Sequence, residues 1–298
     1  MPLDRLITEQ SNTYSSNLDQ LSIEEAVTLM NREDAFIAPI VARSLPSISA
    51  GVRTIAAALG AGGRLIYIGA GNSGRIGYLD ALECQPTFGM SPKEVIGIVA
   101  GGFVRMSEAV EDLTDHGQAD LQGIDLGKED VVVGLTASGR TPYVIGALRY
   151  ARLIGCRTVS VACNTGSEVS AIADIAIEVD CGPEILAGST RLKAGTAQKM
   201  VCNMLSTLSM VVLGKTYGNL MIDLQVHNYK LLLRAQSIVA RAARVSTEVA
   251  ERALAEAGNR PRIAILMLLA NLDRAGAEAL ATAHGGSIHR ALQASRQS

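Results

Sequence analysis

The chain has 298 residues, of which 48% are hydrophobic and 19% charged, and its formal net charge at neutral pH is −2. A charge so close to zero gives no reason to expect nucleic acid or an acidic membrane surface as a partner. The length is sufficient for one large domain and a smaller one, with a mainly aliphatic core because the sequence has no Trp and three Phe.

The five cysteines do not form a disulfide pattern. They have no Cys-x-x-Cys spacing, and an odd number in a chain of this length argues against a disulfide framework. The first ten residues, MPLDRLITEQ, lack the basic and then apolar segments of a secretion signal. The longest apolar run, from Met200 to Leu213, is interrupted by polar residues and is too short to span a membrane. We therefore predict a soluble, cytoplasmic protein with no membrane partner.

The first part of the chain predicts an arm and helices. Residues 1–20 are polar and rich in Ser and Asn, which favours an irregular arm. Ser22 followed by Glu25 fits a capping box and predicts a helix over IEEAVTLMNRED. A longer helix is predicted from Ile37 to Leu59, with a kink or break at Pro46.

Five short apolar runs then alternate with helical patterns. Such alternation, with strands rich in Val and Ile, is typical of a parallel sheet that helices cover on both faces. We therefore predict the α/β class, with a three-layer αβα sandwich built around a five-stranded parallel sheet. The predicted strands are Leu65–Ile68, Val95–Val99, Val131–Leu135, Thr158–Ala162 and Ile175–Val179.

The last third of the chain is predicted to be helical. The segment from Arg191 to Gly214 is apolar on most sides and predicts a buried helix, and Gly218 to Arg244 predicts a further helical region. The remaining residues favour a compact helical module with a small core of its own. We divide the chain into a main domain, residues 1–240, and a C-terminal helical module, residues 241–298.

A glycine-rich turn follows the first predicted strand. Gly69–Gly74 has the pattern G-x-G-x-x-G, and a helix is predicted after it. The unpaired N–H groups and the dipole at the start of such a helix favour an anion. A dinucleotide site of this pattern also needs an acidic residue at the end of the second strand. Because Val99 is followed by Ala100–Gly102, the sequence disfavours a dinucleotide.

The first turn has a counterpart after the predicted strand Val131–Leu135, where Ser138-Gly139-Arg140 repeats Ser73-Gly74-Arg75. One such turn carries little information, because Ser and Gly are common in tight turns. Two matching turns at neighbouring strand ends favour a phosphate monoester, which hydroxyl and backbone N–H groups can bind without a metal. The residues that we predict to bind the substrate there are Asn72, Ser73, Ser138, Arg140 and Thr141.

These turns resemble those of the sugar isomerase (SIS) domain family, which binds phosphosugars. Over nearly its full length the chain also resembles the N-acetylmuramic acid 6-phosphate etherase family. The glucokinase regulatory protein, a non-catalytic sensor of sugar phosphates, shares much of the pattern. The blocks that carry the resemblance are ITEQSNTYSSNLDQLS, GGRLIYIGAGNSGRIGYLDALECQPTFG, DVVVGLTASGRTPYVIGALRYARLIGCRTVSVACN, STRLKAGTAQKMVCNMLSTLSM, GNLMID and HGGSIHRAL.

The resemblance implies the SIS fold and a lyase of cell-wall sugar recycling. Its substrate is N-acetylmuramic acid 6-phosphate, and its products are D-lactate and N-acetylglucosamine 6-phosphate. A base removes the C2 proton, which the C1 aldehyde of the opened sugar acidifies. Lactate then leaves from C3 and water adds to the double bond. This chemistry needs a base, an acid and a clamp for the phosphate, but no metal and no organic cofactor.

Glu83 matches the glutamate that the etherase family uses as its catalytic acid. It falls near the end of the helix predicted after the first turn, more than about 10 Å from Ser73 at the helical rise of 1.5 Å per residue. We therefore expect Glu83 to serve a neighbouring subunit, and the protein to be a homodimer with shared sites.

The second catalytic glutamate of the family is expected shortly after Ala109-Val110-Glu111, where this sequence has Thr114. A threonine hydroxyl cannot serve as a base near neutral pH. Asp115, Asp112 or Glu111 can substitute, and we assign Asp115. The departure leaves two alternatives open, a non-catalytic phosphosugar-binding regulator and an aldose–ketose isomerase.

A further family block contains Glu184, Ser189 and Lys193. The resemblance implies that these residues bind the sugar or assist ring opening. The four histidines have no His-Glu-x-x-His spacing, so we predict no metal site. His284 lies in the HGG block of the resemblance, which leaves open an active-site or a structural role.

Overall fold

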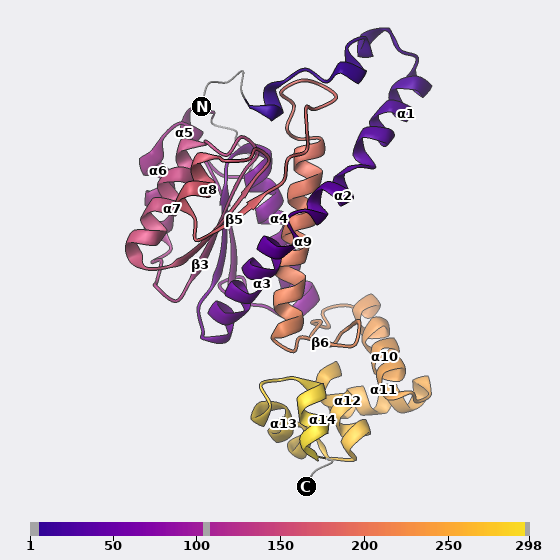
Figure 1. Cartoon of the computed structure of the whole chain (residues 1–298). Coiled ribbons are helices and arrows are strands. Elements are labelled where there is room, and N and C mark those ends of the chain that lie inside the picture. The colour runs from indigo at the N-terminus through magenta and orange to yellow at the C-terminus, as the bar shows by residue number, and fades with distance from the viewer. Residues whose placement is uncertain (1–5, 104–107, 296–298) are drawn as a thin grey trace. The chain divides into compact units, whose positions relative to one another are not determined.

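The computed structural model describes residues 6–103 and 108–295. At its centre lies a five-stranded sheet with the strand order β2-β1-β3-β4-β5, in which all neighbouring strands are parallel (Figure 1). The five predicted strands are confirmed. They are β1 (Leu65–Gly69), β2 (Val95–Val99), β3 (Val131–Thr136), β4 (Arg157–Ala162) and β5 (Ile175–Glu178).

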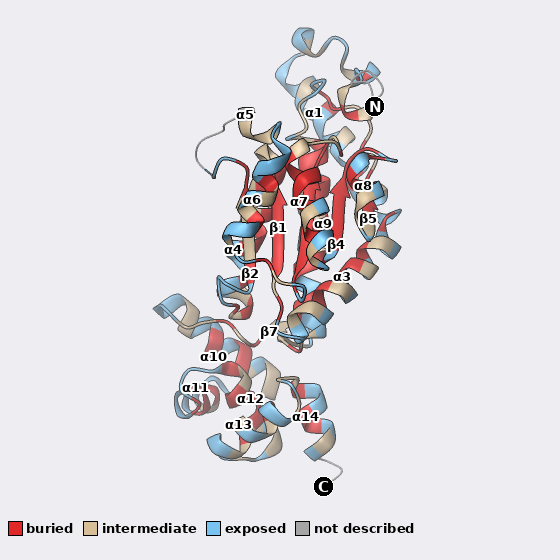
Figure 2. Cartoon of the chain, turned by 90° about the vertical axis from the view of Figure 1, so that its left-hand side faces the viewer, coloured by how far each residue is buried: buried red, intermediate tan, exposed pale blue. Residues whose placement is uncertain are grey.

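The inner strands are buried along almost their whole length, and only Arg157 at the start of β4 is exposed. Every residue of β1 and β3 is buried, whereas the edge strands β2 and β5 contain partly exposed residues (Figure 2). A parallel sheet of this kind has both faces covered, and its inner strands are therefore continuous apolar runs instead of alternating ones.

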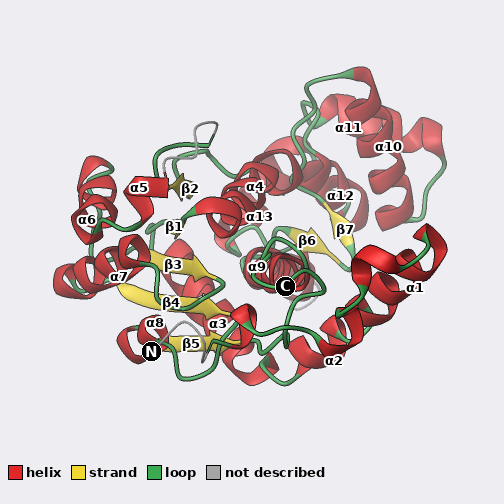
Figure 3. Ribbon diagram, turned by 90° about the horizontal axis from the view of Figure 1, so that it is seen from above, coloured by secondary structure: helices red, strands yellow, loops and turns green. Residues whose placement is uncertain are grey.

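Helices cover the two faces of the sheet (Figure 3). The helices can approach the sheet closely on each face because a glycine lies at the contact. A Cβ at Gly134 would lie 2.8 Å from Val144 on α7, and one at Gly77 on α4 would lie 2.6 Å from Leu135. The predicted three-layer sandwich is thus confirmed. One face carries α5 (Glu108–Glu111), α6 (Thr114–Gly123), α7 (Pro142–Ile154) and α8 (Glu168–Ile172), and the other carries α3 (Leu45–Gly60), α4 (Gly71–Phe88) and α9 (Lys193–Val212).

The N-terminal helices follow the sequence signals. Ser22 and Glu25 form the predicted capping box of α1 (Ile23–Asp34). The long helix predicted from Ile37 is in fact two, α2 (Ile37–Ala42) and α3, with Pro46 in the first turn of α3, where a missing N–H costs nothing. Among the described residues, no single helix is long and apolar enough to cross a membrane. Only the pair Ile23–Ala42 and Leu45–Gly60, bent by 63°, meets that criterion together, by length and composition.

The chain forms two compact units. Unit 1 comprises Met1–Leu82 and Lys93–Ser206, and unit 2 comprises Glu83–Pro92 and Thr207–Ser298. Unit 2 has its own core, whose buried residues run from Ile222 to Leu292. Its elements are β6 (Thr216–Tyr217), β7 (Leu220–Met221), α10 (Tyr229–Ala243), α11 (Thr247–Glu256), α12 (Pro261–Ala270), α13 (Arg274–Ala283) and α14 (Ile288–Ser295), together with the ends of α4 and α9.

The helical region predicted from Gly218 is wrong at its start. Gly218, with φ +56°, turns the β6–β7 hairpin, and Asn228 caps α10 by accepting a hydrogen bond from the Leu231 N–H. The helix therefore begins only at Tyr229. The domain division predicted at residue 240 falls inside α10.

A buried ion pair joins the starts of β1 and β3. Asp130 Oδ2 lies 2.6 Å from Arg64 Nη2, and Asp130 also accepts hydrogen bonds from the Arg64 and Gly127 N–H groups at 2.9 Å. Burial opposes ionisation of Asp130, but the Arg64 guanidinium and the backbone N–H groups of Gly127 and Arg64 together outweigh it and hold the pKa of the carboxyl below its usual value. This pair fixes the first residues of the two central strands beside each other.

We expect Asp130→Asn to lower the free energy of unfolding at pH 7 by about 2–3 kcal/mol, because it leaves Arg64 without its charged partner. Urea denaturation measures this. The folded pKa of Asp130 lies below the unfolded value of about 3.9, so its contribution is present above that pH and is lost as the pH falls through the folded pKa. The difference in the free energy of unfolding between the wild type and the Asp130→Asn variant should therefore shrink as the pH falls through the folded pKa.

The control is Glu129→Gln, since the exposed Lys128–Glu129 pair is 3.8 Å apart. We expect it to change stability by less than about 0.5 kcal/mol. Equal losses in the two variants would contradict the anchoring role of Asp130.

Candidate functional site

The two predicted phosphate turns emerge side by side at the carboxyl edge of the sheet. Gly69, the last residue of β1, pairs in register with Leu135 of β3, and Thr136 pairs with Ala162 at the end of β4. The turns after β1, β3 and β4 therefore lie along one edge, where ligands of open parallel sheets bind.

The first turn leads directly into α4. Gly71 has φ +53°, and the Gly74 N–H donates to the carbonyl of Ala70 at 3.0 Å. A Cβ at Gly74 would lie 2.4 Å from the carbonyl oxygen of Gly69, so only glycine lets the helix start this close to the strand. Ser73 is 8% exposed within the first turn of α4. This arrangement brings the positive end of an 18-residue helix to the edge.

The second turn is organised by hydroxyl groups. Thr136 Oγ1 lies 2.7 Å from Thr141 Oγ1 and accepts a hydrogen bond from the Gly139 N–H at 3.3 Å. The Arg140 N–H donates to Ser138 Oγ at 3.4 Å. Thr141 is the N-cap of α7, and its side chain makes no capping hydrogen bond. Three of the predicted binding residues, Ser138, Arg140 and Thr141, are thus brought together at the start of a helix.

Two other side chains reach the first turn. A Cβ at Gly195 would lie 2.9 Å from Asn72 Nδ2, so the Asn72 side chain lies against the first turn of α9. A Cβ at Gly71 would lie 4.0 Å from Glu111 Oε2, which places the Glu111 carboxylate beside this turn. Asp115, the sequence assignment for the base, is exposed in the first turn of α6.

Sequence analysis missed Asn164, which joins the N-terminal arm to the edge. Asn164 is 3% exposed, donates to the carbonyl of Ala137 at 3.0 Å and to Thr8 Oγ1 at 3.1 Å, and accepts from the Ile7 N–H at 2.8 Å. Its place in the turn Cys163–Ser167, which follows the fourth predicted strand, was a signal in the sequence. The N-terminal arm that Asn164 holds gave no signal in the sequence, because its short 3₁₀ turns have no regular spacing of apolar residues.

Glu184 caps a helix. Its two carboxylate oxygens each accept one backbone hydrogen bond at 2.9 Å, from the N–H groups of Lys193 and Ala194 at the start of α9. The side chain is 1% exposed, and burial raises its pKa despite these hydrogen bonds. The structure gives Glu184 a structural contact, and its sugar-binding role stays a prediction.

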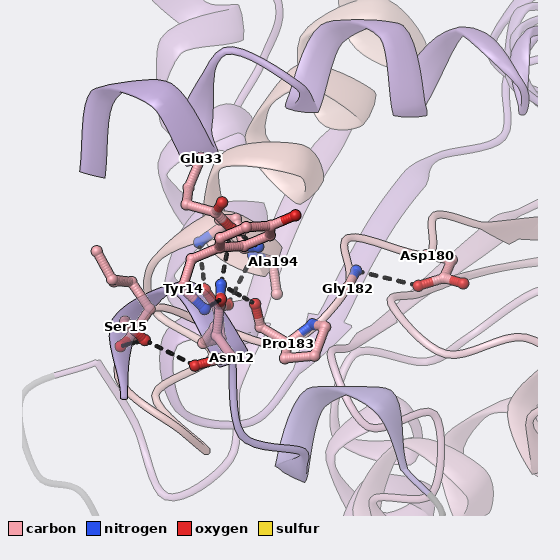
Figure 4. A network of polar contacts seen from close by, with 11 residues as sticks. Asn12, Tyr14, Ser15, Glu33, Asp180, Gly182, Pro183 and Ala194 are labelled. Atoms are coloured by element: carbon pink, nitrogen blue, oxygen red, sulfur yellow. Dashed lines mark hydrogen bonds and ion pairs between the residues drawn. The ribbon is translucent and has the colours of Figure 1, made fainter. Parts of the chain in front are cut away.

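Lys193 pairs with Glu33 of α1, and its Nζ lies 3.0 Å from Glu33 Oε2 (Figure 4). Asn12 of the arm donates to the same oxygen at 2.7 Å and to the carbonyl of Pro183 at 3.3 Å. Burial opposes ionisation of Glu33, but the Lys193 ammonium and the Asn12 amide outweigh it and lower its pKa. The lysine predicted to bind sugar therefore holds the arm, α1 and the start of α9 together.

Two further predicted residues are Ser189 and Glu83. Ser189 is partly buried in the loop before α9, where its N–H donates to the carbonyl of Leu186 at 2.9 Å. Glu83 is exposed on α4, in the part of that helix that belongs to unit 2. Within residues 6–103 and 108–295, no group of three or more His, Cys, Asp and Glu side chains could hold a metal ion.

Comparison with known proteins identifies the family. An N-acetylmuramic acid 6-phosphate etherase from Burkholderia lata is 70% identical to this chain over 98% of the chain and 97% of its own length. The chain belongs to the N-acetylmuramic acid 6-phosphate etherase family. Two further members of the family are each 50% identical to this chain. The one from Actinobacillus pleuropneumoniae serotype 5b matches over 97% of the chain and 96% of its own length. The one from Mycolicibacterium smegmatis matches over 99% of the chain and 100% of its own length.

The matched domain families agree with this membership, and a solved structure agrees with the fold. The N-terminal SIS domain of glucokinase regulatory protein matches residues 47–152, the SIS domain matches 105–208, and the C-terminal lid domain of glucokinase regulatory protein matches 218–262. A Listeria monocytogenes structure assigned as a sugar-phosphate isomerase is similar in fold, with a TM-score of 0.50 and 15% identity over 66% of this chain and 94% of that one. The resemblance seen in the sequence is confirmed.

The second turn yields a stability prediction. Gly139 has φ +75°, and a Cβ there would lie 2.2 Å from the Cβ of Ser167. Gly166 has φ +62°, and a Cβ there would meet no atom within 4 Å. We expect Gly139→Ala to lower the free energy of unfolding by about 2–4 kcal/mol, from left-handed strain plus overpacking. Gly166→Ala should cost about 1 kcal/mol, from strain alone. Urea denaturation of both variants measures the difference, and equal costs would show that Gly139 does not make the predicted close contact.

Proposed function

We propose that this protein is an N-acetylmuramic acid 6-phosphate etherase of cell-wall sugar recycling. As a carbon–oxygen lyase it eliminates D-lactate from its substrate and hydrates the product, which gives N-acetylglucosamine 6-phosphate. The observation that carries this proposal is membership of the etherase family at 70% identity over 98% of the chain. The two hydroxyl-rich turns at one sheet edge support it independently.

The phosphate of the substrate binds at these turns. The starts of α4 and α7 bring the positive ends of two helices to this edge, and Ser73, Ser138 and Thr141 add hydroxyl groups. Helix N-termini favour a dianion through their dipoles. Arg140 supplies a positive charge in the same turn. Asn72, against α9, is positioned to contact the sugar instead of the phosphate.

Glu111 has stronger support as the base than Asp115. The Glu111 carboxylate lies beside Gly71, in the turn that binds the phosphate, whereas Asp115 is exposed at the start of α6. A base must lie within hydrogen-bond reach of the C2 proton. The phosphate on C6 places the substrate next to Glu111, which therefore takes the role that the family gives to the residue replaced by Thr114.

Glu83 is proposed as the acid that protonates the departing lactate oxygen, in a homodimer where it serves the site of the partner. It is exposed on α4, and the exposed Leu79 and Leu82 on the same helix support a contact with a second copy. The five cysteines are all free and buried, which supports a reducing, cytoplasmic location.

Incubation of the purified protein with N-acetylmuramic acid 6-phosphate tests the function. We expect D-lactate and N-acetylglucosamine 6-phosphate in equal amounts. In ¹⁸O-water the label should enter C3 of the sugar and not the lactate, because elimination breaks the bond between C3 and the ether oxygen. Binding by calorimetry without lactate would favour the phosphosugar-binding regulator, which Thr114 supports. A ketose product without lactate would favour the isomerase.

The choice of base yields a second prediction. We expect Glu111→Gln to lower kcat by about 10²–10⁴-fold, the usual contribution of a general base, and to abolish exchange of the C2 proton with deuterated water. Asp115→Asn is the matched control and should change kcat less than about threefold. In Glu83→Gln, lactate release should fall while C2 exchange continues, because an acid acts after the proton is removed. A reversed result for Glu111 and Asp115 would restore the sequence assignment.

A further inference from the structure

The N-terminal arm is an irregular segment that buried polar contacts hold in place. Thr8 and Asn12 are both buried, although they lie in short 3₁₀ turns. Asn12 donates to the carbonyl of Pro183 (Figure 4), and Ser15 Oγ donates to the carbonyl of Ile185 at 2.7 Å. Fixing such a segment costs conformational entropy. None of the residues proposed for the reaction lies on this arm.

Asn164 brings the arm to the second phosphate turn. Its Nδ2 donates both to Thr8 Oγ1 and to the carbonyl of Ala137, the residue that precedes Ser138. Its Oδ1 accepts a hydrogen bond from the Ile7 N–H. Asn164 follows β4, which lies beside β3 on the side away from β1. The arm therefore borders the predicted phosphate turns on the β4 side of the sheet edge.

The loop between β5 and α9 borders the first turn. A Cβ at Gly195, in the first turn of α9, would lie 2.9 Å from Asn72 Nδ2 and 3.5 Å from the carbonyl oxygen of Thr190. The Gly195 N–H donates to that carbonyl oxygen at 3.0 Å. Thr190, near the end of the loop, and Asn72, in the first turn, therefore meet at the same glycine.

Glu9 joins the arm to this loop. A Cβ at Gly188, which has φ +76°, would lie 3.2 Å from Glu9 Oε2, so the carboxylate lies against the loop two residues before Thr190. Contacts thus run from the second turn through Asn164 and the arm to Glu9, and from there through the loop to the first turn. The arm and the loop therefore form one wall beside the two turns.

The backbone of Glu9 is fixed, but its carboxylate has no partner. Leu6 and Thr8 are buried on either side of it in the chain, and the Glu9 N–H donates to the carbonyl of Leu6 at 3.0 Å. Glu9 itself is partly exposed. Among residues 6–103 and 108–295, its carboxylate makes no hydrogen bond and no ion pair. Both of its oxygens therefore keep their capacity to accept hydrogen bonds from a ligand.

A bound sugar phosphate needs acceptors as well as donors. The groups proposed to hold the phosphate are two helix N-termini, three hydroxyl groups and Arg140, all of which suit an anion. The sugar itself carries hydroxyl groups, whose O–H donors need acceptors when they leave water. Glu184 already accepts two backbone N–H groups, and Glu111 is proposed as the base. Glu9 supplies a carboxylate that neither of these roles occupies.

We propose that Glu9 is a substrate-binding residue of the sheet-edge site, whose carboxylate accepts a hydrogen bond from a hydroxyl group of the sugar. This inference rests on the proposed function, because it requires a sugar phosphate at the two turns. A carboxylate repels a phosphate dianion, so Glu9 contacts the sugar and not the phosphate. The ordered arm thereby favours a sugar phosphate over a free phosphate ion.

Calorimetric titration of the full-length wild type and of Glu9→Gln with N-acetylglucosamine 6-phosphate and with inorganic phosphate tests this role. We expect Glu9→Gln to weaken binding of the sugar phosphate about fivefold to tenfold, the step from a charge-assisted to a neutral hydrogen bond. Inorganic phosphate should bind the variant at least as tightly as the wild type, because the substitution removes a negative charge. The two ligands should therefore respond in different directions.

Glu24→Gln makes the same change on the exposed side of α1 and is the matched control. It should bind both ligands as the wild type does. Thermal unfolding shows whether each variant is folded. If Glu9 only stabilised the arm, Glu9→Gln would lower the Tm and weaken the binding of both ligands together, and that result would overturn the proposal.

Equal affinity of the wild type and Glu9→Gln for the sugar phosphate would overturn the proposal, as would the absence of sugar phosphate binding by the wild type. D-lactate release by the wild type tests the reaction separately. Lactate release together with unchanged binding by Glu9→Gln would overturn only the role of Glu9. Weakened binding by Glu9→Gln without lactate release by the wild type would overturn only the reaction.

Discussion

The candidate site depends on the parallel register between β1 and β3. Because Gly69 lies opposite Leu135, the turns that follow the two strands open at the same height, and two helix N-termini and their hydroxyl groups face one space. The Arg64–Asp130 pair fixes this register from the other end of the strands. A slip of one residue would turn every buried side chain of the strands to the wrong face, so the proposed phosphate clamp and the core are specified together.

Several polar residues near this edge stabilise the structure that surrounds the site. Glu184 satisfies two N–H groups at the start of α9, Lys193 pairs with Glu33, and Asn164 holds the N-terminal arm. Buried polar groups must be paired because desolvation is costly. The resemblance marks such residues as important but does not separate those that contact a ligand from those that position the residues that do.

Unit 2 is organised by a different balance of forces. Its helices are short and bury aliphatic side chains, while Asp223, next to Ile222 of that core, pairs with Arg262 and Lys215. Burial raises the pKa of Asp223 even though Arg262 and Lys215 oppose it. The unit therefore combines an apolar core with one partly buried carboxylate that two cations hold.

The sequence by itself determined the class of fold, the five strands, the capping box at Ser22 and the two glycine- and serine-containing turns after β1 and β3. These features depend on local signals, namely apolar period, caps and glycine at turns. Only the tertiary structure decided that Glu111 lies beside Gly71, that Lys193 pairs with Glu33 and that Arg262 fills the space left by Gly286. It also decided that residues 218–228 are a hairpin and a loop. Such contacts join residues far apart in the chain, and no local pattern encodes which of several charged side chains will meet.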